Sequence, residues 1–172
     1  SIANFAFAWC GALQTVSIPR TTASVGGLAF HETPWLLAQS GEDGWVRIGS
    51  SDHYVYTGTE SRVEIPAYIR SFDFNCSASV TEVILPEGIT AIGDHSFQMC
   101  DALRSVTFPA SLTSVGDAAF AFCTSLWSVT LPAGVRSIGR DAFHECSALR
   151  NVTIPEGVET IEDFTFTYCS SL

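Results

Sequence analysis

The C-terminal half of the chain repeats itself every 23 residues. Four consecutive stretches align without a gap, beginning at Leu85, Phe108, Leu131 and Ile154. In each stretch Pro follows the first residue, and Phe and Leu recur in fixed columns: Phe97, Phe120, Phe143 and Phe166, then Leu103, Leu126, Leu149 and Leu172. Self-similarity at such a period is typical of a solenoid, in which each repeat buries its apolar face only against its neighbours.

The pattern continues toward the N-terminus with two irregularities. Pro19 and Pro66 lie 47 residues apart, which is one period plus 24 residues. The repeat from Ile65 to Ile84 has only 20 residues, three fewer than the others. We predict one domain, and because its first and last repeats are incomplete we expect it to belong to a longer array. The domain covers 1–172, with repeat segments 1–30, 63–84, 85–107, 108–130, 131–153 and 154–172 and an insertion at 31–62.

The sequence pattern of each repeat predicts a short strand followed by turns. Polar and apolar residues alternate from Ser128 to Leu131, and the next residue is a Pro, which cannot donate to a sheet ladder. Identical strands one period apart can pair only in parallel, with coils stacked about 4.8 Å apart. Val135 and Ile138 predict a second extended piece. The A-F-x-x-C segment favours a helical turn that carries Phe and Cys inward.

The consensus L-P-x-x-V-x-x-I-G-x-x-A-F-x-x-C-x-x-L-x-x-V-x, clearest from Leu131 to Thr153, resembles the BspA-type or treponemal leucine-rich repeats. The segments TPW from Thr33, DGWVRIG from Asp43 and YVYTGT from Tyr54 resemble the hairpin that interrupts such arrays. The resemblance implies a leucine-rich-repeat solenoid, mostly β, with short parallel strands, short helical turns and one inserted β-hairpin. It also implies a secreted or cell-surface protein, bacterial or from some protozoa, in a family where a few members are adhesins. The three-residue deletion near Phe72 and Glu162 in place of Gly depart from the consensus.

The charge balance argues against two classes of partner. Eighteen acidic residues oppose eight basic ones, all Arg, for a formal net charge of −10. Such a chain lacks the basic patch that a nucleic acid or an anionic membrane needs. No apolar run approaches the ~20 residues that span a bilayer. The apolar N-terminus lacks the basic residues of a signal peptide.

Six cysteines share one repeat position: Cys10, Cys76, Cys100, Cys123, Cys146 and Cys169. Side chains in register point the same way and stay near the coil spacing, whereas a disulfide brings the Cβ atoms to ~3.8 Å. We therefore predict a column of buried free thiols, with Cys10, beside the irregular coils, as the exception. A linear column of thiols does not converge on a tetrahedral metal.

The remaining polar residues suggest no catalytic or metal site. His31-Glu32 and His144-Glu145 share a position, but neither has the second His of an HExxH motif. We interpret that position as solvent-exposed, and His53 and His95 have no evident partner. No Ser-His-Asp set, G-x-S-x-G motif or phosphate loop can be identified, and the acidic run from Glu156 to Asp163 lacks a calcium loop. We predict no cofactor, no metal and no enzymatic activity.

Three surfaces are left as sites for a partner. The outward polar residues of the strands form either a binding face or an ordinary solvent-facing sheet: Glu82, Ser105, Thr107, Ser128, Thr130, Asn151 and Thr153. Trp45, Tyr54 and Tyr56 give the insertion a concentration of aromatic rings, part of which must cover the neighbouring coils. A further column, two residues after each Phe, is either an interface or packs over the next coil: Trp9, Glu32, Met99, Phe122, Glu145 and Tyr168.

Three functions are consistent with these features. The first is a protein-interaction or adhesion module that binds a host matrix protein or another cell-surface protein. The second is a structural spacer or stalk with no ligand of its own. The third is a carbohydrate-binding or enzymatic module that works through the aromatic insertion. The resemblance and the lack of a catalytic constellation favour the first.

Overall fold

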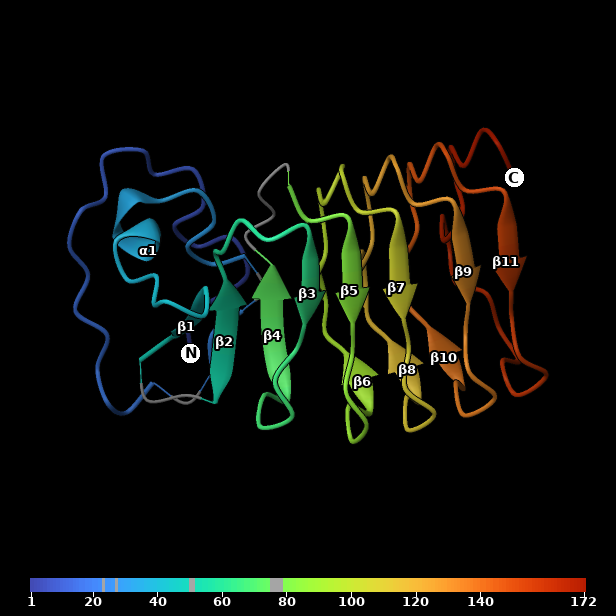
Figure 1. Ribbon diagram of the computed structural model, residues 1–172, viewed down its shortest axis with the longest axis horizontal. Coiled ribbons are helices and arrows are strands. Elements are labelled where there is room, and N and C mark those ends of the chain that lie inside the picture. The colour runs from blue at the N-terminus through green and yellow to red at the C-terminus, as the bar shows by residue number, and fades with distance from the viewer. Residues whose placement is uncertain (23, 27, 50–51, 75–78) are drawn as a thin grey trace.

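The computed structural model describes residues 1–172 except 23, 27, 50–51 and 75–78. It is a solenoid whose coils follow one another along the long axis (Figure 1). The predicted leucine-rich-repeat solenoid, mostly β with short stacked strands, is therefore confirmed. Among the described residues, no helix is long and apolar enough to cross a membrane.

Two columns of parallel strands form two sides of the solenoid. Each strand of the first column is three residues long: β3 (Arg62–Glu64), β5 (Glu82–Ile84), β7 (Ser105–Thr107), β9 (Ser128–Thr130) and β11 (Asn151–Thr153). Ladders join β3 to β5, β5 to β7 and β9 to β11. Between β7 and β9 the N–H of Trp127 donates to the carbonyl of Arg104 at 3.4 Å. The second column is β6 (Ala91–Ile92), β8 (Ser114–Val115) and β10 (Ser137–Ile138).

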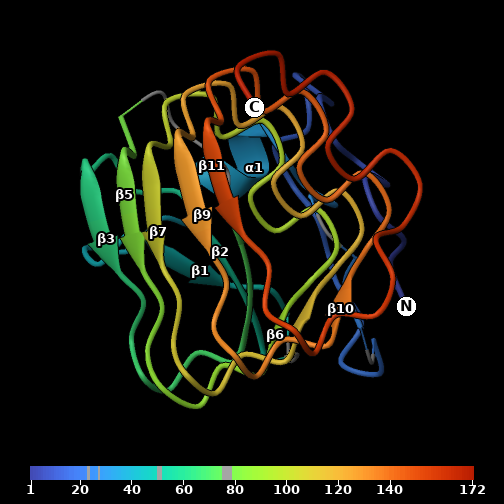
Figure 2. The ribbon, with the colours of Figure 1, turned by 90° about the vertical axis from the view of Figure 1, so that its right-hand side faces the viewer.

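Turns rather than helices form the third side, seen end-on in Figure 2. The Cys100 N–H donates to the Phe97 carbonyl within the same turn at 3.1 Å. The Phe97 N–H instead donates to the carbonyl of Ala119 in the next coil at 2.8 Å. The predicted helical turn is thus a run of tight turns in which part of the N–H groups join neighbouring coils. In each regular repeat from Leu85 onward, two non-glycine residues adopt positive φ, such as Ala118 at 50° and Phe122 at 64°.

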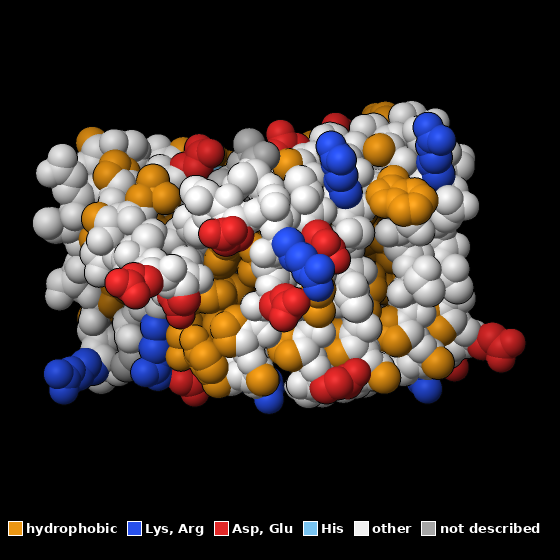
Figure 3. All heavy atoms as spheres, in the orientation of Figure 1, with side chains coloured by type: hydrophobic (Ala, Val, Ile, Leu, Met, Phe, Trp, Pro, Cys, Tyr) orange, Lys and Arg blue, Asp and Glu red, His pale blue; other side chains and the backbone are white. Residues whose placement is uncertain are grey.

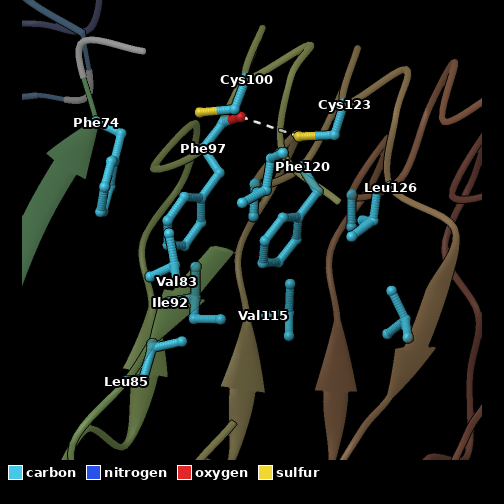
Figure 4. Close-up of a cluster of buried hydrophobic side chains, with 14 of the residues drawn as sticks. Phe74, Val83, Leu85, Ile92, Phe97, Cys100, Val115, Phe120, Cys123 and Leu126 are labelled. Carbon is cyan, nitrogen blue, oxygen red and sulfur yellow. Dashed lines mark hydrogen bonds between the residues drawn. The ribbon is translucent and has the colours of Figure 1, made fainter. Parts of the chain in front are cut away.

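The recurring apolar residues meet in one core, as the repeat predicts. The rings of Phe97 and Phe120 stack with centroids 4.9 Å apart, and those of Phe120 and Phe143 stack at 5.2 Å. These three side chains are fully buried. Figure 4 shows Phe97 and Phe120 on neighbouring coils. Leu103, Leu126 and Leu149 are buried in the same cluster. The stacked arrangement adds ring–ring attraction to the burial of apolar area.

The insertion contains the predicted hairpin. Strands β1 (Trp45–Arg47) and β2 (His53–Tyr56) pair antiparallel, and β2 pairs in parallel with β4 (Ser71–Phe74). A short helix, α1 (Pro34–Leu37), precedes it and is capped by the Thr33 side chain. Val46 and Val55 pack into a small core with the N-terminal repeats, whereas Trp45 and Tyr56 pack into the main core. The hairpin therefore separates two cores and is buried on both faces.

The cysteine prediction holds for part of the column. Cys123, Cys146 and Cys169 are buried free thiols, and Cys10 is free and exposed. The Cys123 Sγ donates to the Phe97 carbonyl at 3.1 Å (Figure 4), and Cys146 and Cys169 make the same contact with the preceding coil.

The prediction of a free thiol is wrong for Cys100, which is disulfide-bonded. Cys76 lies outside the described residues. The prediction assumed that all coils are equivalent. The repeat before Cys100 is three residues short, which breaks that equivalence.

Candidate interaction surface

We use the term strand face for the outward side chains of β3, β5, β7, β9 and β11. Thr107, Thr130, Asn151 and Thr153 are exposed, and Glu82, Ser105 and Ser128 are half-buried. The ladders place Glu82 beside Ser105, Asn151 beside Ser128 and Thr153 beside Thr130. The predicted strand residues thus lie together on one side of the solenoid, with the strands side by side in Figures 1 and 2.

One row of residues at the border of this face was not predicted from the sequence. Arg104, Trp127 and Arg150 each precede a strand, and we call them the arginine–tryptophan row. The Trp127 N–H donates to the Arg104 carbonyl, and the Arg150 N–H donates to the Trp127 carbonyl at 3.0 Å. The Trp127 side chain is 54% exposed and both arginines are exposed. The signal was present in the aligned segments LRSVT, LWSVT and LRNVT, just outside the columns that define the core.

The charges around the row differ from those elsewhere on the chain. Arg62, at the far end of the strand face, pairs with Glu64 at 3.2 Å and Glu82 at 3.9 Å. Among the described residues no ion pair or side-chain hydrogen bond involves Arg104 or Arg150. Figure 3 shows basic side chains on both sides of an apolar one in this part of the face. The row therefore presents two uncompensated cations beside an exposed indole.

The aromatic residues of the insertion do not form the predicted binding patch. Trp45 is 8% exposed and Tyr56 3%, because their strand side faces the main core. Tyr54 is half-buried against the exposed Tyr68, with ring centroids 5.8 Å apart. The hairpin is covered on both faces, which the sequence pattern of the insertion does not reveal.

The column two residues after each Phe is partly exposed, as an interface would be, and partly packed over the next coil. Trp9 is 52% exposed and Tyr168 69%, whereas Phe122 is half-buried. His144 lies between the rings of Phe122, at 5.6 Å, and Tyr168, at 5.5 Å. The interpretation of the histidine position as solvent-exposed is therefore wrong: His31 is 5% exposed and His144 is half-buried. Aromatic rings of adjacent coils cover this position.

His53 has partners that the sequence did not indicate. Its Nδ1 lies 2.9 Å from the Ser71 Oγ, and its Nε2 lies 3.1 Å from the Asp73 Oδ2. The same Asp73 oxygen accepts the Leu28 N–H at 2.9 Å. In the regular coils the equivalent N–H donates to a carbonyl of the next coil, as Ala118 does to Arg140. We assign this Ser-His-Asp set a structural role, because its carboxylate joins the N-terminal repeats to β4.

Two of the hollows that border the coils lie beside polar side chains. One of about 310 Å³ lies beside this set, lined by Asn4, His53, Ser71 and Asp73 among others. Another of about 420 Å³ runs along β8 and β10. There Asp94 accepts the Asp117 N–H and Asp117 accepts the Arg140 N–H, both at 2.9 Å. These carboxylates bind the backbone of the next coil, which is a structural use.

The buried thiols are poor nucleophiles. Burial raises the pKa of Cys146 to about 12 and that of Cys123 well above its usual value. The thiolate is the reactive form, so these groups are inert at neutral pH. In the part of the chain that the structure describes, no cluster of His, Cys, Asp or Glu could hold a metal ion.

Comparison with known proteins agrees with this geometry. A treponemal leucine-rich-repeat protein from T. pallidum superposes with a TM-score of 0.63 and 27% identity, over 74% of this chain and 65% of that one. A leucine rich cell surface protein from Faecalibacterium prausnitzii A2-165 gives a TM-score of 0.69 at 24% identity, over 99% of this chain and 55% of that one. The pneumococcal vaccine antigen PcpA gives 0.62 at 16% identity, over 94% of this chain and 44% of that one.

In all three pairs the chain spans less than two thirds of the other protein's length. The two pairs below 25% identity show a common fold. No curated protein matches the chain. The family model of the BspA type leucine rich repeat region matches residues 1–51 and 67–172 with six copies. The chain therefore belongs to the BspA-type leucine-rich-repeat family.

Proposed function

We propose that the chain is a non-catalytic protein-interaction module of a secreted or cell-surface bacterial protein, and that it binds a protein partner through the strand face. The observation that supports this most is the exposed Trp127, which directly precedes β9 in a column of hydroxyl-rich strands. The likeness to a leucine rich cell surface protein supports the location. We also propose that residues 1–172 act as one domain, with host matrix or cell-surface proteins as the class of partner.

The chemistry of the face suits a protein partner. Thr107, Thr130 and Thr153 stand in neighbouring positions on β7, β9 and β11, and each offers a donor and two acceptors. Their branched Cβ atoms restrict the side-chain rotamers, so little entropy is lost when they bind. Exposed Trp and Arg side chains are enriched among the residues that contribute most to protein interfaces.

A direct test places bulky charged side chains on the face. The purified chain is screened by surface plasmon resonance against purified matrix proteins and cell-surface proteins at micromolar concentration. We expect the double variant Thr107→Glu and Thr130→Glu to weaken the binding that the native chain shows by at least about tenfold. Thr90→Glu, at an exposed position between β5 and β6, is the matched control and should bind like the native chain. Failure of the native chain to retain any protein would overturn the proposal.

A spacer role is the second candidate, and the equivalence of successive coils favours it. Deleting Phe108–Thr130 removes one 23-residue period and keeps the junction sequence intact. A pure spacer would keep its biological activity with a shorter reach. The interaction module would lose binding, because the deletion removes Trp127.

A further inference from the structure

We propose that the arginine–tryptophan row is the specificity site of the strand face, and that it receives a segment of a partner protein in which two carboxylates flank an apolar or aromatic side chain. This assignment depends on the proposed function and names the chemistry of the partner. It goes beyond the strand hydroxyls to Arg104, Trp127 and Arg150.

The spacing of the row points to two carboxylates. The three residues occupy consecutive coils, so neighbouring backbones lie about 4.8 Å apart and the two arginine backbones lie about twice that distance apart. The Trp127 side chain stands between them. Each guanidinium presents a planar fork of donors that fits one carboxylate in a bidentate manner. Two forks separated by an indole therefore match two acidic side chains separated by a group that packs on the indole.

The charges of the strands support an acidic partner. The segments Arg104–Thr107, Trp127–Thr130 and Arg150–Thr153 contain two arginines and no acidic residue, in a chain with eighteen acidic residues. Glu82 borders the row on the β5 side, and the exposed Asp101 lies three positions before Arg104 in the same coil. A bound acidic segment would therefore extend toward β9 and β11, away from these carboxylates. Complementary charge of this kind steers encounter and selects the partner.

Arg104 and Arg150 have no ion-pair or side-chain hydrogen-bond partner among the described residues, unlike several other arginines of the chain. Arg140 is neutralised by Asp163 at 2.8 Å and Arg47 by Asp52 at 2.8 Å. Arg136 donates to the carbonyls of Ala133 and Val135. By contrast, Arg104 and Arg150 keep their donors available to a partner. A neutral sugar could stack on Trp127 but would leave both charges without a counterpart, which favours the protein over the glycan.

The test uses the whole chain as bait for a displayed library of random linear peptides, followed by affinity measurement on synthetic copies of the recovered peptides. We expect acidic residues on both sides of an apolar or aromatic residue to be enriched. Arg104→Gln with Arg150→Gln should weaken binding at least tenfold, and Trp127→Ser should do the same. Raising the salt concentration should weaken the native complex more than the complex of the double Gln variant.

Matched controls keep the assignment falsifiable. Arg62→Gln removes a cation from the same face that is already paired, and Tyr168→Ser removes an exposed aromatic side chain from another face; both should bind like the native chain. Thermal melting of every variant shows that it is folded. Peptides that lack acidic residues, or that bind the double Gln variant equally well, would overturn this inference while leaving the proposed function intact.

Binding to a glycan array tests the alternative that the chain recognises a carbohydrate. Binding of the native chain to acidic polysaccharides, with no peptide or protein retained, would overturn both the inference and the proposed function. Binding to acid-flanked peptides that depends on Arg104 and Arg150 would support both.

Discussion

The Asp73 carboxylate accepts the backbone N–H of Leu28 at 2.9 Å and faces His53 Nε2 from the same oxygen at 3.1 Å. These contacts join residues that lie 45 and 20 positions apart in the chain. In effect, a side chain replaces the carbonyl that a regular neighbouring coil would provide. The two parts of the solenoid are therefore connected by a buried polar contact as well as by the hairpin.

Removing this carboxylate should loosen the junction. Asp73→Ala leaves the buried Leu28 N–H without an acceptor, which we expect to lower the free energy of unfolding by about 1–3 kcal/mol. Hydrogen exchange should accelerate around Leu28–Thr33 and β2, and change little in β9 and β11. The exposed Asp117→Ala, which removes a comparable contact inside the regular array, is the control. Equal acceleration in β9 and β11 would contradict a local role for Asp73.

The Phe column should dominate the stability of the core. Phe120 is fully buried and stacks on two neighbours, so Phe120→Ala should cost about 3–5 kcal/mol in chemical denaturation. Phe122, two residues later, is half-buried and its replacement by Ala should cost much less. Similar losses for the two variants would mean that the columns are not packed as described.

The buried thiols should make stability depend on pH at alkaline values. Burial raises the pKa of Cys146 from about 9 to about 12, so the folded state favours the protonated thiol. This contribution is fully present below pH 9 and is lost as the pH rises toward 12. Cys146→Ala should reduce the alkaline loss of stability in denaturation series at several pH values. An unchanged pH profile would contradict the burial of this thiol.

Alkylation gives an independent check on the cysteines. The exposed Cys10 should react with iodoacetamide in the native protein, whereas Cys123 and Cys146 should react only after unfolding. Mass spectrometry of peptides from native and denatured samples distinguishes the sites. Rapid native labelling of Cys146 would show that its coil is open.

The periodic part of the fold could be predicted because each core residue recurs in register. Phe97 and Phe120 occupy the same position in consecutive repeats. Because equivalent coils stack on one another, residues at the same repeat position come into contact. The hairpin was predicted as well, from the resemblance of the inserted segments to the hairpin that interrupts such arrays. The orientation of Trp45 could not be predicted. The alternation of residue types along a strand shows that its two faces differ, but it does not show which part of the protein covers either face.

The candidate site was only partly predictable. The strand residues Thr107 and Thr130 follow from alternation within each repeat. Arg104 and Trp127 lie one position before the strands, where the residue type varies between repeats. A consensus built from the core residues therefore does not include them. The pairing of His53 with Asp73 arises from the insertion, whose position beside β4 no repeat pattern specifies.

The most direct test of the strand face is a hydrogen-exchange footprint of the native chain with and without a saturating partner from the binding screen. We predict slower exchange in the segments Arg104–Thr107, Trp127–Thr130 and Arg150–Thr153, and little change in β1 and β2. Slower exchange confined to the hairpin or to the turns around Phe122 and Tyr168, with the strand segments unchanged, would contradict the assignment of the strand face as the binding surface.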